Sequence, residues 1–313
     1  MSPVVAAVVV TFRRRALLTE ALEALRAQSR GPDRVVVVDN ASGDGTPELV
    51  RARFPEAELL ELPANTGGAG GFAAGIAHAL DGGADLLWLL DDDTVPEPGA
   101  LAALLTAMEP GGGTEAPVLA ASRVVWTDGR DHPMNTPRRK PRASSAELAR
   151  AEAVNGYPIR SASFVSVLVD ADRVRARGLP IADYFLWNDD FEFTMRILRG
   201  RFGLLCRDSL VVHKTATFGS TDADPGPRFY YEVRNKVWLF TRSRALSPAE
   251  RLLYGGSTLR RWVRTFTGSQ DRGTLLRCLA RGLGDGLRKR PRPTGEVLRS
   301  LGDRHGRGQT TSM

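Results

Sequence analysis

A repeated alternation of apolar runs with helix-forming segments fills the first third of the chain and most constrains its fold. The apolar runs are continuous rather than alternating, as in strands that are buried on both faces. Parallel strands joined by right-handed helical crossovers produce this rhythm. The sequence therefore predicts an α/β fold with a mostly parallel central sheet flanked by helices. The predicted strands are Val4–Thr11, Arg34–Asp39, Glu58–Leu62 and Asp85–Leu90, and the predicted helices are Ala16–Ser29, Pro47–Phe54, Phe72–Leu80 and Pro98–Met108.

A polar loop follows each of these four strands. Ligands of open α/β sheets bind beyond the carboxyl ends of the strands, so the loops are expected to converge on one binding site. The loop at Asn65–Gly71 is rich in glycine, which allows a backbone to approach a ligand closely. It is neither a G-x-G-x-x-G loop after the first strand nor a G-x-x-x-x-G-K-[ST] motif, which argues against a dinucleotide-binding site and a P-loop NTPase. The other loops are Thr11-Phe12-Arg13, Asp39-Asn40 and Asp91-Asp92-Asp93.

The regular alternation of predicted strands and helices ends after Gly111-Gly112-Gly113. Val118–Thr127 is predicted to be a strand that pairs with Ser163–Val169. The polar, proline-containing segment between them, Asp128–Arg160, is predicted to be a long mobile loop, a kind of segment that is usually functional or disordered. Beyond it we predict a helix over Phe191–Arg199, strand within Leu204–His213 and mainly helix from Phe229 onward.

Charge divides the chain into two unequal parts. The 313 residues carry a net charge of +7. Up to Pro225, 24 basic and 30 acidic residues leave −6, whereas from Gly226 onward 19 basic and 6 acidic residues leave +13. We therefore separate an acidic domain over residues 1–225 from a basic, mainly helical region over residues 226–313. A basic region of this kind suits an anionic partner such as membrane, nucleic acid or phosphate.

Cysteine usage and the start of the chain exclude several classes of protein. Cys206 and Cys278 provide neither a disulfide framework nor zinc-ligand spacing, so both are expected to be reduced thiols. Met1-Ser2-Pro3 lacks a basic n-region, and the apolar run after it is too short for a signal peptide. No uninterrupted apolar run reaches the ~18 residues of a spanning helix. These observations favour a cytoplasmic protein without a membrane span.

Three adjacent carboxylates, Asp91-Asp92-Asp93, follow the fourth predicted strand. They repel one another unless a cation or hydrogen-bond donors are present. Alternate side chains of an extended chain point the same way, so Asp91 and Asp93 are expected to face one ion while Asp92 points elsewhere. Carboxylate oxygens suit Mg²⁺ or Mn²⁺, which often bridge substrate phosphates. A solvated acidic loop is the alternative, which the α/β context disfavours.

Three further features each allow a functional and a structural interpretation. Asp39 is placed either to accept hydrogen bonds from a base or ribose or to start an Asx-turn. Asp189 and Asp190, in the segment Trp187–Glu192, either include a general base whose pKa is raised by burial or complement the dipole of a helix. His213 ends a strand and either completes the metal site or is structural.

The motifs taken together resemble the family 2 glycosyltransferases with a GT-A fold. They are TFRR, VVDNAS, NTGGAGGF and LLDDD after the four strands, and WNDDFEF further on. The similarity is closest to the galactofuranosyltransferases that start the cell-wall galactan of actinobacteria, with rhamnosyltransferases as near neighbours, and it covers roughly residues 4–240. It implies a metal-dependent, inverting transfer of a sugar, with galactofuranose from UDP-galactofuranose favoured. The implied acceptor is a polyprenyl-diphosphate-linked glycan in cell-wall or surface polysaccharide synthesis.

The resemblance assigns roles by position. Asp190 corresponds to the catalytic base, and Asp189 and Glu192 orient the acceptor or the base. The metal, Mn²⁺ or Mg²⁺, is assigned the ligands Asp91, Asp93 and His213. The implied donor-binding residues are Thr11, Arg13, Asp39, Asn65, Gly67, Gly68, Gly70 and Asp92. The donor half is expected over about residues 1–110 and the acceptor half over 111–225. An aromatic cluster before an Arg-Asn pair, Phe229–Asn235, also recurs without an assigned role.

The basic region carries two apolar stripes with helical spacing, each flanked by arginines. They are Leu259, Trp262, Val263 and Phe266, and Leu276, Leu279, Leu283 and Leu287. Two interpretations stay open: the helices pack on the catalytic domain, or they lie on anionic lipid at the inner face of the cell membrane. The run Arg138–Arg142 either serves the acceptor diphosphate or is a solvated loop, and the loop is slightly favoured. Lys289–Ser300 and the end to Met313 are expected to be frayed or disordered.

Three other functions are weighed against this one. A dTDP-rhamnose-dependent rhamnosyltransferase is the nearest. A nucleotidyltransferase would usually carry a lysine in an N-terminal glycine loop, which TFRRR does not provide. A basic membrane-binding or nucleic-acid-binding module is disfavoured by the acidic body and by the lack of a nucleic-acid motif, so no nucleic-acid partner is expected. Acceptor, linkage and oligomeric state are left open.

Overall fold

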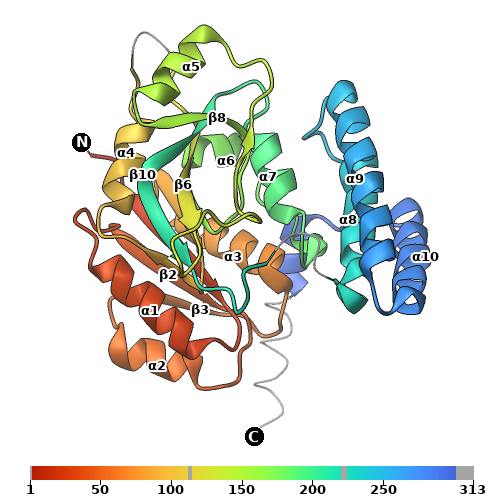
Figure 1. Cartoon of the computed structure of the whole chain (residues 1–313). Helices are drawn as coiled ribbons and strands as arrows, with labels where there is room; N and C mark the ends of the chain where they lie inside the picture. The colour runs from red at the N-terminus through yellow and green to blue at the C-terminus, as the bar shows by residue number, and fades with distance from the viewer. Residues whose placement is uncertain (1, 112–114, 220–223, 301–313) are drawn as a thin grey trace, which may run out of the picture.

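The computed structural model describes residues 2–111, 115–219 and 224–300. Figure 1 shows a central sheet covered by helices and, beside it, a separate group of helices. This group consists of α8 (Phe229–Thr241), α9 (Pro248–Gly268) and α10 (Arg272–Arg288). No helix in the described ranges is both long enough and apolar enough to cross a membrane.

The first third of the chain forms the predicted alternation of strands and helices. Strands β1 to β4 pair in parallel in the order β3-β2-β1-β4. The register pairs Thr11 with Asp39 and Val10 with Asp91. The carboxyl ends of β1, β2 and β4 therefore meet at one edge of the sheet. The elements are β1 (Val5–Thr11), α1 (Arg15–Arg26), β2 (Arg34–Asp39), α2 (Thr46–Arg53), β3 (Glu58–Glu61), α3 (Gly67–Asp81), β4 (Leu86–Asp91), β5 (Thr94–Pro96) and α4 (Ala100–Met108).

The glycine-rich segment differs from its prediction, because from Gly67 onward it forms the first turns of α3 rather than a loop. A Cβ built on Gly71 would lie 2.4 Å from Val10 Cγ1, and one on Gly75 would lie 2.5 Å from Val8 Cγ1. Both distances are too short for real carbon atoms. These glycines therefore let α3 lie directly on β1, close to the carboxyl edge of the sheet.

The second half of the chain completes the ten-stranded sheet, whose order continues from β4 as β9-β6-β10-β8-β7. Strand β9 is antiparallel to both β4 and β6, which confirms the predicted pairing of Val118–Thr127 with Ser163–Val169. Strands β9, β8 and β5 run against the rest, so the sheet is mixed with mostly parallel strands. Pairing of His213 in β10 with Thr94 in β5 brings His213 beside the acidic cluster. The strands are β6 (Leu119–Val125), β7 (Arg138–Arg139), β8 (Gly156–Ser161), β9 (Ser166–Asp170) and β10 (Gly203–His213).

Two hydrophobic layers lie on the two faces of this sheet. Successive residues of β1 alternate between them, with Val8 in one layer and Val9 in the other. Helix α3 covers the first layer through Phe72, whereas α1 and α4 cover the second through Leu18 and Leu104. Because both faces are covered, the central strands are apolar throughout, which is why their sequences read as continuous runs.

The prediction of a long loop over Asp128–Arg160 is wrong. The segment contains β7, helix α5 (Ser145–Glu152) and β8. Ser144 and Glu147 form a capping box that starts α5, and the Arg150 guanidinium donates to the carbonyl oxygens of Thr106, Ala107 and Glu109. Short elements held by such distant contacts carry little periodicity of their own, so the sequence pattern did not reveal them.

Further short helices connect these parts: α6 (Ala171–Arg177), the 3₁₀ turn η1 (Ala182–Tyr184), α7 (Asp189–Ile197) and the 3₁₀ turn η2 (Gly226–Arg228). The region from Phe229 is helical, as predicted, and α8 packs against α10 through Val233 and Leu275. Only part of the apolar stripe of α9 packs against the other helices. Trp262 packs edge-on against Phe229, whereas Leu259 and Val263 remain 62% and 63% exposed.

The prediction that Lys289–Ser300 is frayed or disordered is also wrong. Trp238 Nε1 donates to the carbonyl oxygen of Lys289 at 3.0 Å. Arg292 forms an ion pair with Asp183, and Val297 is buried against the catalytic domain. This segment therefore ties the helical group back to the sheet domain. The prediction for the end of the chain falls on residues 301–313, which lie outside the described residues.

Candidate functional site

A cavity of about 660 Å³ opens at the carboxyl edge of the sheet. Residues from β4, α3, the start of α7, the end of β10 and the helical group line it. The cavity brings together the two acidic clusters that are far apart in the sequence. Its lining includes Gly68, Asp91, Asp189, Asp190, His213 and Trp262.

Asp91, Asp93 and His213 form one cluster at the floor of this site. One ligand atom from each lies within 4.8 Å of the other two. Burial, and then the charge of Asp93, raise the pKa of Asp91 to about 7. In the described part of the chain no hydrogen bond to the Asp91 carboxylate is found. Two carboxylates and an imidazole, with one acid left unpaired, are a donor set that fits Mg²⁺ or Mn²⁺.

Asn135 holds the imidazole of this cluster in place, and the sequence analysis missed it because it falls in the segment predicted as a loop. His213 Nδ1 lies 2.9 Å from Asn135 Oδ1, and Asn135 Nδ2 donates to Ser163 Oγ at 3.1 Å. Since the amide oxygen only accepts, Nδ1 donates to it, and Nε2 donates to Asp93 Oδ1, 3.0 Å away. Burial opposes the charged ring, but the hydrogen bond and charge of Asp93 raise the pKa of His213, and a metal would take the place of the Nε2 proton. Nε2 is therefore the nitrogen available to a metal.

Asp92 points away from this cluster, toward the first loop. Its Oδ2 accepts from Thr11 Oγ1 at 2.8 Å, and its Oδ1 accepts from the Arg14 guanidinium at 3.1 Å. The same guanidinium donates to Asp93 Oδ2 at 2.6 Å. Thr11 and Asp92 therefore bind each other, and Arg14, which the sequence analysis did not select, neutralises part of the acidic cluster.

Asp39 forms the turn that is one of its two interpretations. Its Oδ2 accepts from the backbone N–H of Ser42 at 3.2 Å, which forms the turn. Its Oδ1 is buried without a hydrogen-bond partner, and Asp39 is not among the residues that line the cavity. Arg13 closes the same turn from the first loop, because its Nε donates to the Ser42 carbonyl at 3.0 Å.

The glycine motif at the start of α3 has two functions in the structure. Asn65 Oδ1 accepts from Gly67 N–H at 2.8 Å. A Cβ on Gly67, which has φ +70°, would lie 1.9 Å from the Phe185 carbonyl oxygen, and a Cβ on Gly70 would lie 2.4 Å from Thr66. Gly67 and Gly70 are therefore required for packing. Gly68 has open space around it and lines the cavity.

The second acidic cluster starts α7 after an unusual loop. Phe185, Trp187 and Asn188 all have left-handed backbone, with φ of 64°, 66° and 65°. Burial, and then the charge of Asp190, raise the pKa of Asp189 well above its usual value. Burial also raises the pKa of Asp190, but the Phe191 N–H and the charge of Lys236 oppose this shift. Asp190 is therefore the member of the pair that ionises more readily.

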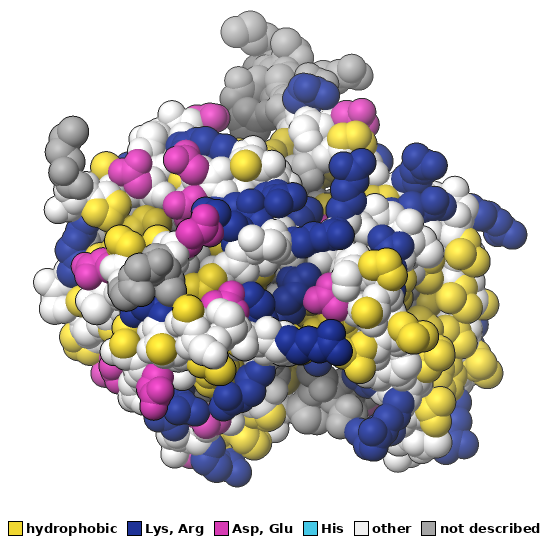
Figure 2. Space-filling model, turned by 90° about the horizontal axis from the view of Figure 1, so that it is seen from above, with side chains coloured by type: hydrophobic (Ala, Val, Ile, Leu, Met, Phe, Trp, Pro, Cys, Tyr) yellow, Lys and Arg dark blue, Asp and Glu magenta, His cyan; other side chains and the backbone are white. Residues whose placement is uncertain are grey.

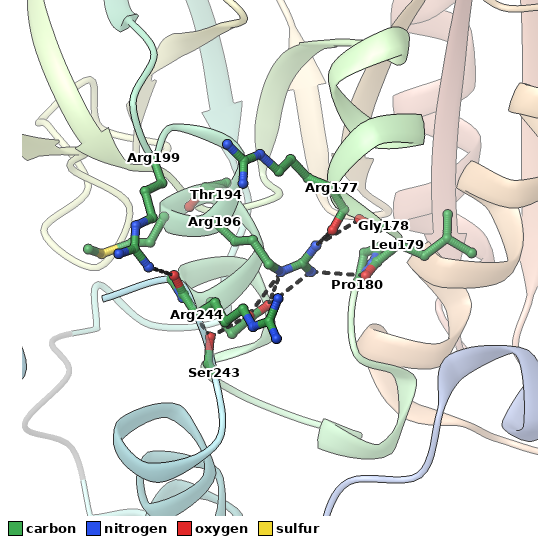
Figure 3. Close-up of polar contacts among 12 residues, drawn as sticks. Arg177, Gly178, Leu179, Pro180, Thr194, Arg196, Arg199, Ser243 and Arg244 are labelled. Carbon is green, nitrogen blue, oxygen red and sulfur yellow. Dashed lines mark hydrogen bonds and ion pairs between the residues drawn. The ribbon is translucent and has the colours of Figure 1, made fainter. Parts of the chain in front are cut away.

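Glu192 is placed apart from the other predicted catalytic residues and does not line the cavity. It is buried, with 1% exposure, and its carboxylate pairs with Arg196 Nε at 3.0 Å and accepts from Ser243 Oγ at 2.6 Å. Figure 3 shows Arg196 also reaching the carbonyl oxygens of residues 177–179. This network anchors α7 to its neighbours, which is a structural contribution rather than contact with an acceptor.

The motif Phe229–Asn235 gains a physical explanation. The Asn235 amide donates to the carbonyl oxygens of Tyr184, Leu186 and Trp187 at 2.8–3.0 Å. The Arg234 guanidinium donates to the carbonyl oxygens of Asp183 and Tyr184. The motif therefore clamps the left-handed loop that presents Asp189 and Asp190, a role that follows only from the folded arrangement.

Comparison with protein families and curated relatives finds the model of glycosyl transferase family 2, which matches residues 6–158. Two relatives are named galactofuranosyltransferase GlfT1. The one from Mycolicibacterium smegmatis is 31% identical over 291 residues, covering 83% of this chain and 94% of the relative. The one from Mycobacterium tuberculosis is 33% identical over 276 residues, covering 82% and 88%.

Solved structures with a similar fold include S. aureus TarS 1–349 in complex with UDP-GlcNAc. It has a TM-score of 0.58 and 17% identity and covers 90% of this chain and 80% of that one. The mannosyltransferase PcManGT from Pyrobaculum calidifontis, in complex with GDP-Man and Mn²⁺, has a TM-score of 0.55 and 19% identity and covers 96% and 79%. At these identities the likeness concerns the fold, and it confirms the fold expected from the sequence.

Proposed function

The chain belongs to glycosyl transferase family 2 and has the GT-A fold, and from this premise we propose that it transfers galactofuranose from UDP-galactofuranose to a lipid-linked glycan. It is a glycosyltransferase by family. The donor sugar is proposed from the relatives named galactofuranosyltransferase. The observation that carries the proposal is that Asp91, His213 and the Asp189–Asp190 pair line one cavity, because metal-assisted transfer needs both groups beside one substrate.

We propose that Asp91, Asp93 and His213 hold Mn²⁺ or Mg²⁺, which supplies positive charge for the donor diphosphate. Asp39 is suited to the nucleoside, because its buried Oδ1 has no other partner. Gly68 lines the cavity and has no side chain, so the backbone of α3 can approach the donor there. The other residues assigned to the donor support this site indirectly, through the contacts described above. They are Thr11, Arg13, Asn65, Gly67, Gly70 and Asp92.

Asp190 is the proposed general base. It takes a proton from an acceptor hydroxyl, and the hydroxyl oxygen forms a bond to the anomeric carbon as the bond from that carbon to the diphosphate oxygen breaks. Attack from the face opposite the leaving group inverts the anomeric centre. Asp189 has the higher pKa, so it keeps a proton and avoids a second negative charge beside the base. Glu192 holds α7 and acts on the base only through this helix.

The acceptor is proposed to carry a polyprenyl diphosphate and to be met at an anionic membrane surface. Leu252, Leu259 and Val263 on α9 and Leu276 and Leu287 on α10 are exposed by 58–82%. Exposed arginines flank them, including Arg260, Arg264, Arg277, Arg281 and Arg288. Figure 2 shows hydrophobic side chains gathered on the side of the molecule where Figure 1 places this helical group, with basic side chains around them. Such a face suits peripheral binding to lipid.

The test is a donor screen with purified protein, Mn²⁺ and a lipid-linked rhamnosyl acceptor. We expect transfer from UDP-galactofuranose, and we expect UDP binding to require the metal. Preference for dTDP-rhamnose would instead identify a rhamnosyltransferase. Release of pyrophosphate from a nucleoside triphosphate and a sugar phosphate would identify a nucleotidyltransferase and overturn the proposal.

Replacement of the proposed base provides the first prediction. Asp190→Asn should lower transfer by about 10²–10⁴-fold, the usual contribution of a general base, while calorimetry shows UDP binding unchanged. Asp81→Asn, at the exposed end of α3, is the matched control. Loss of donor binding together with continued transfer at saturating donor would show that Asp190 is not the base.

A further inference from the structure

A second cavity, of about 480 Å³, lies at the opposite end of α7 from the acidic pair. We name it the basic pocket. Segments that follow β7 and α7, together with β8 and the start of α9, form its walls. Its charged lining comprises five basic side chains and one acid: Lys140, Arg142, Arg160, Arg199, Arg201 and Glu250.

Two of the five cations have no acidic partner in the described part of the chain. Arg160 is buried and neutralised by Glu250, with Nε 2.6 Å from Oε1, so it serves the framework. Arg199 donates to a backbone carbonyl, that of Arg244, as Figure 3 shows. For the side chain of Arg142 no partner is found among the described residues. The pocket therefore presents an excess of positive charge that the protein itself does not balance.

The basic run Arg138–Arg142 extends from the neighbourhood of the proposed base to the pocket. Arg138 lies over the rings of Phe191 and Tyr254, at 5.5 and 5.6 Å, next to Asp190. Arg139 points the other way, over the ring of Tyr157 at 3.9 Å. Lys140, the next residue, lines the pocket and forms an ion pair with Glu147. The basic run that was favoured as a solvated loop is thus held by ring contacts at one end and lines the pocket at the other.

Helix α7 sets the separation between the two. It has nine residues, which corresponds to about 13 Å at 1.5 Å per residue. Asp190 stands in its first turn, and Leu198 and Arg199, which line the pocket, follow its last residue. At the rim Leu253 is 61% exposed, so an anion bound in the pocket would have apolar surface beside it.

We propose that the basic pocket binds the phosphate groups of a lipid-linked acceptor, with Arg142 and Arg199 as the principal donors. This inference rests on the proposed function and adds the position of the anionic end of the acceptor. The glycan then spans the ~13 Å along α7 to the hydroxyl that Asp190 deprotonates, and the lipid leaves past Leu253. The length of α7 thereby sets the length of glycan that fits between the phosphate group and the reacting hydroxyl.

The double variant Arg142→Gln plus Arg199→Gln tests this assignment, since neither residue contacts the catalytic cavity. The KM for a prenyl-diphosphate-linked glycan should rise about tenfold or more for each lost charged hydrogen-bond donor. We expect kcat, UDP affinity and the KM for the same glycan on a neutral alkyl chain to stay unchanged. Arg51→Gln plus Arg53→Gln, on α2, removes two exposed charges elsewhere and should change none of these values. Equal KM changes for both acceptors would overturn the proposal.

A binding experiment without donor separates this inference from the proposed function. Calorimetry with a short prenyl diphosphate and with inorganic pyrophosphate should show binding to the unmodified protein and at least tenfold weaker binding to the double variant. This result would support the pocket even if no galactofuranose were transferred. Vesicles of phosphatidylglycerol should bind both proteins alike. If vesicle binding is lost instead while prenyl diphosphate binding persists, the pocket holds phospholipid headgroups and the proposal fails.

Discussion

Among single residues, Asn135 shows most clearly how a side chain outside the acidic motifs shapes the site. Its amide oxygen fixes the His213 ring so that Nε2 faces Asp93. Asn135→Leu should therefore weaken Mn²⁺ binding about 10–100-fold, the usual effect of removing such a supporting group. Titration of Mn²⁺ followed by electron paramagnetic resonance measures the affinity. Gln270→Leu, an exposed amide far along the chain, is the control, and unchanged Mn²⁺ affinity in Asn135→Leu would contradict this role.

The charge of Lys236 gives a second prediction, on pH. Burial lowers the pKa of Lys236 to about 8, so it is still mostly cationic at neutral pH, where it opposes the rise that burial causes in the pKa of Asp190. Asp190 is the proposed general base, and a general base works when deprotonated, so the rate should fall as the pH falls through the pKa of Asp190. Lys236→Met removes the cation and should move this acidic limb to higher pH. Lys289→Met, on an exposed cation, should leave the kcat/KM profile in place, and an unmoved limb in Lys236→Met would contradict the coupling.

Within helix α3, two neighbouring glycines provide a matched pair of substitutions. A Cβ on Gly67 would overlap the Phe185 carbonyl at 1.9 Å, whereas a Cβ on Gly68 meets open space. Gly67→Ala should lower the free energy of unfolding by about 2–4 kcal/mol, since it combines strain at positive φ with a backbone clash. Gly68→Ala should keep the stability but weaken UDP binding, because Gly68 lines the cavity. Urea unfolding and calorimetry distinguish the two, and equal destabilisation would refute the division of roles.

The elements also show which parts of this structure a sequence can predict. Strands buried on both faces, such as β1, can be predicted from their continuous apolar runs. The loops that follow these strands correctly predicted where the acidic cluster lies. The elements β7, α5 and β8 were missed because a capping box at Ser144 and distant pairing with β10 hold them. Asn135 was missed, and the motif that ends in Asn235 was left without a role, for a related reason. Their importance lies in contacts with His213 and the 184–187 carbonyls, which are distant in sequence and have no local pattern.

For the molecule as a whole, the split of charge corresponds to two regions that meet at the cavity. The acidic part holds the Asp91 and Asp190 clusters, and the basic helices contribute Arg228, Arg261 and Trp262 to the same lining. The segment around Val297 fastens these helices to the sheet domain. The proposed lipid-binding face of α9 and α10 therefore belongs to the same packed body as the proposed acceptor site.

The exposed leucine and valine side chains of α9 test this arrangement. Leu259→Gln plus Val263→Gln removes two side chains that are 62% and 63% exposed and therefore contribute little to the folded core. Burial of each in lipid is worth about 1.5–3 kcal/mol, so binding to phosphatidylglycerol vesicles should fall at least tenfold in sedimentation, with UDP affinity and unfolding unchanged. Leu148→Gln, at a 52% exposed position on α5, is the matched control. Because arginines flank the stripe, added salt should also weaken vesicle binding by the unmodified protein. If the double variant binds vesicles as well as the unmodified protein does, the membrane contact lies elsewhere.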